Sequence, residues 1–141
     1  MRKSIWLWVM SSLLAWHTQA QSLVGTWKTI DDETQKARSY VKMYKTKSGK
    51  YAGKIVKLLD TNQQNATCDK CTDYRKGEPV LNMVIVTGLE SSGDEWKGGK
   101  ILDPEKGKVY TCKMWLDDSN ELKVRGYLGP FYRTQTWYRV K

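Results

Sequence analysis

From about residue 23 to the last residues, apolar positions alternate with polar ones and do not recur at helical spacing. Most of the alternating stretches are seven to ten residues long and rich in β-branched and aromatic residues, which is typical of strands. The stretch at 80–89 is apolar on both faces, so we expect it to be the most buried. The pattern predicts eight strands, at 24–30, 38–45, 50–59, 80–89, 94–102, 108–116, 120–128 and 131–140.

Short turn sequences separate most of these strands. The clearest is "DPEKG" at 103–107, because Pro104 presets the first turn residue and Gly107 accepts a positive φ. Acidic pairs such as Asp31-Asp32 fall at strand ends, where carboxylates serve as turn formers. Eight strands with short links form an up-and-down meander, and closing it removes two exposed edges. The predicted fold is therefore all-β, an eight-stranded antiparallel up-and-down barrel.

The first twenty residues have the pattern of a cleaved secretory signal peptide. Arg2 and Lys3 precede a short apolar run, and the segment ends in the small residue Ala20. We expect residues 1–20 to be the signal peptide and 21–141 a single domain, exported to the periplasm or secreted. The alternative is an uncleaved membrane anchor, which the short apolar run does not favour. We expect no transmembrane segment in the mature chain.

Cleavage would also change the chemistry of the chain. It removes the only histidine, His17, and lowers the formal net charge from +9 to +7 by removing two basic residues. Without histidine, the chain cannot use a Ser-His-Asp or Cys-His mechanism, and it cannot bind zinc through imidazole. The sequence therefore predicts no catalytic residue, metal or cofactor, and does not favour an enzyme. The lysines are scattered along every segment, which favours a solvated surface and gives no indication of nucleic-acid binding.

Several longer stretches resemble a known bacterial family, the exported proteins with domain of unknown function 2147. The resemblance covers essentially the whole mature chain. It implies a lipocalin-like (calycin-like) barrel, carries no established activity and transfers no catalytic residue. The matching stretches are "GTWKT" at 25–29, "YAGKIV" at 51–56, "GEPVLNMVIVTGL" at 77–89, "WKGGKILDPEKGKVYTCKMWL" at 96–116 and "LKVRGYLGPFYRTQTWYRV" at 122–140.

Trp27 opens the first predicted strand, and this placement resembles the lipocalin arrangement. There, the first-strand tryptophan closes the barrel floor and a basic residue of the last strand lies across its ring. An arginine over an indole gains cation–π attraction. We expect Trp27 and Arg139 to form the structural floor, although spacing leaves Arg133 open as the arginine on the ring. The alternative is that Trp27 is an exposed binding hot spot.

The cysteines predict a staple and a buried thiol. Cys68 and Cys71 form "CDKC" in a polar stretch with no helix or βαβ pattern after it, so we expect a structural disulfide. Thiol-redox activity of this pair is the alternative. Cys112 alternates with apolar residues, which favours a free buried thiol over pairing with the other two. The long loop at 59–79 is either a lid over one barrel mouth or a stapled surface loop.

The last two strands carry the candidate ligand site. An inward arginine with glutamine would hold a carboxylate or phosphate while aromatic residues enclose an apolar body. The predicted lining residues are Arg125, Tyr127, Arg133, Gln135 and Trp137. The function predicted is binding of a small amphipathic or anionic ligand. The alternative is an interaction module with a filled barrel, docking on an anionic envelope surface such as glycolipid or on a protein; oligomeric state is left open.

Overall fold

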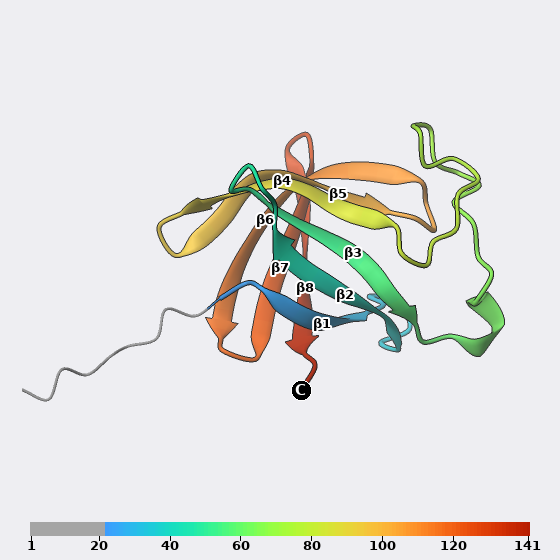
Figure 1. Cartoon of the computed structure of the whole chain (residues 1–141), viewed down its shortest axis with the longest axis horizontal. Helices are drawn as coiled ribbons and strands as arrows, with labels where there is room; N and C mark the ends of the chain where they lie inside the picture. Colours follow the sequence, from blue (N-terminus) through green and yellow to red (C-terminus); the bar gives the residue numbers. More distant parts are fainter. Residues whose placement is uncertain (1–21) are drawn as a thin grey trace, which may run out of the picture.

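The computed structural model describes residues 22–141, so the predicted signal peptide lies outside the described residues. Eight antiparallel strands pair in chain order and close into one barrel, and the fold prediction is confirmed (Figure 1). A single 3-10 turn, η1, interrupts the β3–β4 connection. The elements are β1 (Gly25–Ile30), β2 (Ala37–Lys45), β3 (Tyr51–Leu58), η1 (Thr61–Gln63), β4 (Val84–Ser92), β5 (Glu95–Asp103), β6 (Lys108–Asp118), β7 (Glu121–Leu128) and β8 (Phe131–Arg139).

Most strand boundaries fall within one or two residues of the prediction, and β4 is the exception. It was expected from residue 80 and begins at Val84. Asn82 has a positive φ of 69°, which breaks the extended backbone before the strand. The apolar residues ahead of β4 are nevertheless buried, because Val80 and Met83 of the long connection pack into the apolar core. Their burial, and not strand geometry, accounts for the apolar pattern.

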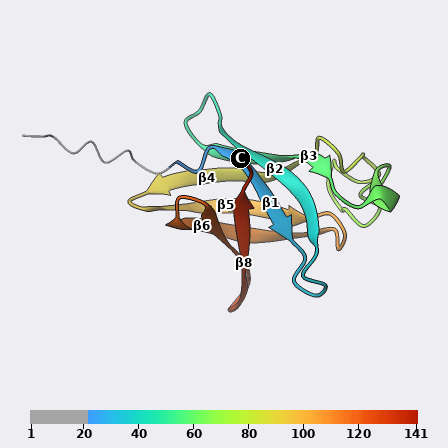
Figure 2. The same cartoon turned by 90° about the horizontal axis from the view of Figure 1, so that it is seen from below.

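The barrel closes through β1 and β8. Trp27 pairs with Arg139 and Lys28 with Tyr138 across this seam, and both views show the two strands side by side (Figures 1 and 2). Trp27 is fully buried and its indole Nε1 donates to the carbonyl of Leu23 at 3.0 Å. The bulky residue at the start of the first strand is therefore a plug with its one polar atom satisfied.

Arg139 lies over this plug. Its guanidinium carbon is 4.2 Å from the centroid of the Trp27 ring, and its nitrogens donate to the carbonyls of Ser22, Val24 and Ser119 at 2.9, 3.3 and 2.7 Å. The sequence left open whether Arg139 or Arg133 lies on the Trp27 ring, and it is Arg139. Gly25 is required beside it, because a Cβ there would lie 2.7 Å from Arg139 Nη1 and the backbone has φ +142°.

Apolar side chains fill the half of the barrel next to Trp27. They come from every strand, which is expected when inward positions alternate around a small closed sheet. Residues buried there include Val41, Met43, Val86, Leu89, Cys112, Met114, Leu122 and Trp137.

The same apolar core continues under the connection between β3 and β4, which projects from one end of the barrel (Figures 1 and 2). Cys68 and Cys71 form a disulfide there, which confirms the predicted staple, and both cysteines are buried. Gly107 of the β5–β6 turn packs so closely that a Cβ on it would collide with the Lys70 carbonyl. Arg75 Nη1 donates to the carbonyl of Val84 at 3.0 Å. The connection is therefore built onto the barrel wall and the neighbouring turn.

Candidate functional site

The two ends of the barrel differ in composition. Because the strands are antiparallel and joined in order, alternate connections lie at the same end. Trp27 and Arg139 seal one end, which we call the floor. The opposite end, which we call the mouth, carries the connections at 31–36, 59–83, 104–107 and 129–130. The candidate site lies at the mouth, where the inner face of β8 carries the polar residues Arg133 and Gln135.

Inward-facing residues at the mouth remain open to solvent. Arg133 lies opposite Gly126 in the β7–β8 register, and Gly126 faces the barrel interior, because a Cβ on it would lie 3.3 Å from Tyr110 Cβ. The Arg133 side chain is nevertheless 66% exposed. Phe131, two residues away on the same face, is 77% exposed. The β7–β8 hairpin therefore carries inner-face side chains that remain exposed to solvent at the mouth.

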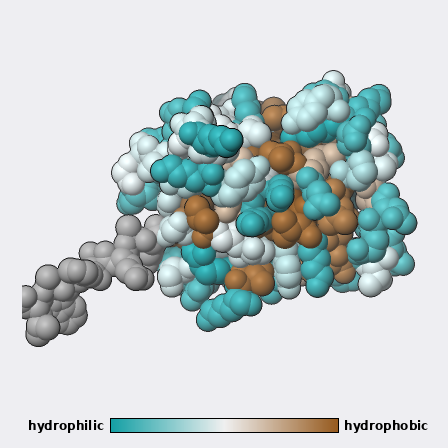
Figure 3. All heavy atoms as spheres, viewed as in Figure 1, coloured by the Kyte–Doolittle hydropathy of each residue, from teal (hydrophilic) through white to brown (hydrophobic). Residues whose placement is uncertain are grey.

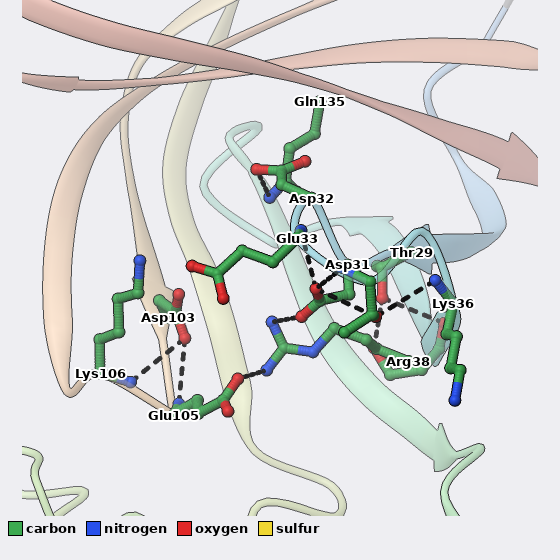
Figure 4. Close-up of polar contacts among 12 residues, drawn as sticks. Thr29, Asp31, Asp32, Glu33, Lys36, Arg38, Asp103, Glu105, Lys106 and Gln135 are labelled. Atoms are coloured by element: carbon green, nitrogen blue, oxygen red, sulfur yellow. Dashed lines mark hydrogen bonds and ion pairs between the residues drawn. The ribbon is translucent and has the colours of Figure 1, made fainter.

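A chain of polar contacts runs from the mouth toward the core, and Figure 4 shows its first contact, between Asp32 and Gln135. Gln135 Nε2 donates to Asp32 Oδ2 at 3.0 Å, and Gln135 Oε1 accepts from the buried Trp137 indole at 3.2 Å. Arg133 Nη1 lies 3.8 Å from the same Asp32 oxygen. Asp32 therefore engages both residues, but the long Arg133 contact leaves most guanidinium donors free.

A second set of contacts crosses the mouth. Arg38 of β2 lies between Asp31 of the β1–β2 loop and Glu105 of the β5–β6 turn, at 3.6 and 2.7 Å (Figure 4). Since β2 and β5 are three strands apart in barrel order, this ion pair spans part of the opening. The backbone N–H of Thr34 is the main cause that holds the pKa of Asp31 below its ordinary value.

Two buried hydroxyls and one unpaired donor complete the polar groups of the interior. Thr29 and Ser39 are buried on paired strands, and their hydroxyl oxygens lie 2.8 Å apart. Trp96, packed edge-on against Tyr51, has a buried Nε1 without a hydrogen-bond partner. Buried polar atoms normally have partners, so the Trp96 indole is the exception among the described side chains.

The structure corrects part of the predicted lining. Arg125 and Tyr127 lie on the outer face, because they pair with Thr134 and Tyr132, whereas the inward positions of β7 are Leu122, Val124 and Gly126. Arg125 lies over the rings of Trp115 and Tyr132, with centroids at 5.0 and 4.3 Å. Strand alternation places these two side chains opposite the interior.

The other three predicted residues lie on the inner face at different depths. Arg133 is at the rim, Gln135 is half-buried below it, and Trp137 is buried at 2% exposure. Trp137 is therefore enclosed next to Gln135, whose Oε1 accepts from its indole. Sequence reasoning missed Asp32 and Arg38 as mouth residues, since they lie on or next to strands far from β8 in sequence. Only the barrel register brings them together.

All three cysteine side chains are buried. Within the described residues Cys112 is the free cysteine, and burial raises the pKa of its thiol to about 12. The disulfide pair is buried against the β5–β6 turn, with Cys68 Sγ 3.4 Å from the Pro104 carbonyl. Neither group has the exposed, electropositive setting of a reactive cysteine. Among residues 22–141, no three acidic, cysteine or histidine side chains are grouped as metal ligands.

The surface is mostly hydrophilic, with limited apolar areas. On the face seen in Figure 1, a hydrophobic area near the centre is surrounded by hydrophilic side chains (Figure 3). The β7–β8 hairpin tip, at the mouth, exposes Leu128 and Phe131 by 53% and 77%. No helix within residues 22–141 has the length and apolar character needed to cross a bilayer.

Comparison with known proteins gives a family and a fold. A family model described as "Uncharacterized protein conserved in bacteria (DUF2147)" matches residues 25–139. A solved structure, protein HP1028 from the human pathogen Helicobacter pylori, described as belonging to the lipocalin family, matches with a TM-score of 0.73. It is 19% identical, and the match covers 85% of this chain and 84% of that chain. No curated protein matches the chain significantly.

Proposed function

The chain belongs to the DUF2147 family of bacterial proteins and has a lipocalin-like barrel, and from this premise we propose that it is an exported carrier protein. Its ligand would be a small amphipathic molecule with one anionic group, held at the mouth of the barrel. The observation that carries the proposal is the solvent exposure of inward-facing Arg133 and Phe131. Export is supported by the Cys68–Cys71 disulfide, since such bonds persist in oxidising compartments.

The mouth offers such a ligand both polar contacts, at the rim and just below it, and apolar contacts. Arg133 would donate to a carboxylate or phosphate at the rim, because its fork of donors is only weakly engaged by Asp32. Gln135 offers a second polar contact below it. The apolar part would lie against Phe131 of the hairpin and the inner face near Tyr110 and Ile101, both of which are half-buried. A few convergent polar groups above an apolar base are typical of small-molecule sites.

Asp32 sets the expected selectivity. Its carboxylate lies at the rim beside Arg133 and repels an incoming anion, while it also fixes the Gln135 amide. Replacing it by asparagine removes the charge and keeps an oxygen that accepts from Gln135. We expect Asp32→Asn to bind an anionic amphiphile more tightly than the original protein.

The experiment has two arms. Native mass spectrometry of protein purified from its own host should show a bound small molecule of defined mass. A fluorescent medium-chain fatty acid and its alcohol analogue are then titrated against the original protein and Arg133→Gln. Loss of the charged donor should weaken the acid about tenfold and leave the alcohol unchanged, since hydrogen bonds to charged groups are worth about 1.5 kcal/mol or more.

Arg125→Gln is the matched control, because it removes the same charge from the neighbouring strand on the outer face. It should bind both probes as the original protein does. Equal weakening by the two substitutions would assign the effect to long-range charge and overturn the rim site. Absence of both a co-purifying molecule and probe binding would leave the barrel a closed structural module.

A further inference from the structure

Lysines that are scattered in the sequence converge on one outer wall of the barrel. Lys28 of β1 lies opposite Tyr40 of β2, and Tyr40 lies opposite Lys57 of β3. One row along, Lys42 of β2 lies directly opposite Lys54 of β3. These three strands lie side by side in the sheet (Figure 1). We call Lys28, Lys42, Lys54 and Lys57 the lysine face.

The charges of the lysine face are not neutralised by ion pairs within the described part of the chain. Within the described residues, none of its four ammonium groups is within ion-pair distance of a carboxylate, although six other basic side chains are. Across the β1–β8–β7 register from Lys28, the first carboxylate is Glu121, which lies beyond Tyr138 on β7. Like charges directly opposite in an antiparallel pair are destabilising. The fold therefore carries a local electrostatic cost that a bound anionic partner would offset.

Two tyrosines lie beside these charges, Tyr40 between Lys28 and Lys57, and Tyr138 on the other side of Lys28. Lys28 Nζ lies 6.0 Å from the Tyr138 ring centroid, and Lys57 Nζ lies 5.5 Å from that of Tyr40. Lysines therefore approach these rings, which disfavours stacking of bases or sugars on them. No arginine belongs to the set, so bidentate recognition of single oxyanions is not built in. The arrangement suits diffuse attraction to many charges.

The charges spread in two dimensions. Strand spacing of about 4.8 Å places Lys28 and Lys57 about 10 Å apart across three strands, and the two rows are about 7 Å apart along them. A linear polyanion follows a single line, whereas an anionic lipid leaflet presents charge across a plane. Tyrosine is also a residue that favours the headgroup level of a membrane.

We propose that the lysine face docks the barrel on an anionic phospholipid surface, at the headgroup level and without insertion. Each lysine close to such a surface contributes about fivefold to affinity. The formal net charge of +7 outside the predicted leader supports approach to that surface. This docking is independent of whether the mouth binds a ligand.

Co-sedimentation with vesicles of phosphatidylglycerol and phosphatidylcholine in equal parts tests the proposal. Lys42→Gln with Lys54→Gln should weaken binding about 25-fold at low salt. The matched control, Lys100→Gln with Lys108→Gln, removes the same charge from β5 and β6, where both side chains are exposed. The control should bind as the original protein does.

Three outcomes would overturn the docking surface. One is equal weakening by both double variants, which would reduce the effect to net charge. Another is unchanged binding by the lysine-face variant. The third is retention on soluble polyphosphate or dextran sulfate with no vesicle binding. The lysine-face variant should also unfold at a slightly higher urea concentration at low salt, because the Lys42–Lys54 repulsion is gone; this readout separates misfolding from lost docking.

Discussion

Replacing Arg139 by methionine tests the barrel floor. Methionine keeps an apolar stem over Trp27 but removes the cation–π contact and three hydrogen bonds to carbonyls. A partly buried cation–π contact is worth about 1 to 2 kcal/mol. The carbonyls are exposed and can return to water, so each hydrogen bond adds only about 0.5 kcal/mol. The free energy of unfolding should therefore fall by about 3 kcal/mol.

Equilibrium unfolding in urea, followed by tryptophan fluorescence, measures this change directly because Trp27 and Trp137 are buried. The melting temperature should fall by about 10 °C in parallel. Arg139→Lys should lose about half as much, since lysine keeps the charge but not the planar fork that stacks and donates at once.

Arg133→Met is the control, with the same chemical change six residues earlier on the same strand and face. Arg133 is 66% exposed and its ion pair is 3.8 Å long, so its loss should cost no more than about 0.5 kcal/mol. If the two methionine variants prove equally stable, Arg139 does not hold the floor and the plug interpretation of Trp27 is wrong.

Three further predictions follow from local geometry. Cys112 should resist thiol-modifying reagents at neutral pH in the folded protein and react once urea unfolds it, because burial raises its pKa to about 12; rapid native labelling would contradict this. Gly107→Ala should destabilise by about 2 kcal/mol or more in urea unfolding, whereas Gly49→Ala, also at positive φ but in open space, should cost only its backbone strain of about 1 kcal/mol. The pKa of Asp31 is lowered by the Thr34 N–H, so its stabilisation is present above the ordinary pKa of 3.8 and lost as pH falls through the folded value; Asp31→Asn should show a weaker loss of stability on acidification.

The strands were predictable because they depend on local alternation, and closure was predictable because an open eight-stranded meander would leave two exposed edges. The positions on β7 and β8 alternate as expected, and Trp27 meets Arg139 of the last strand, the contact that the lipocalin resemblance implied. The β4 boundary was misplaced because Val80 and Met83 are buried by loop packing, which produces the same apolar pattern as a strand. Alternation reports burial, and burial has more than one cause.

The candidate site was only partly predictable. Alternation shows which residues share a face but does not say which face is inside, and Arg125 and Tyr127 were assigned to the wrong one. Asp32 meets Gln135 across 103 positions of sequence, a contact set by closure of the whole sheet. The lysine face is a similar case, since its members are unremarkable until the register aligns them.

The seam between β1 and β8 has a kinetic consequence. It joins Trp27 to Arg139, two partners separated by nearly the whole described chain, and its register contains only two residue pairs. Closing so long a loop costs entropy before the contacts of the seam can stabilise the fold. The hairpins from β2 to β7 can form earlier from near neighbours, and the ring is completed last. The Trp27 indole would thus be buried in the last step of folding. An open, curled sheet would precede the closed barrel.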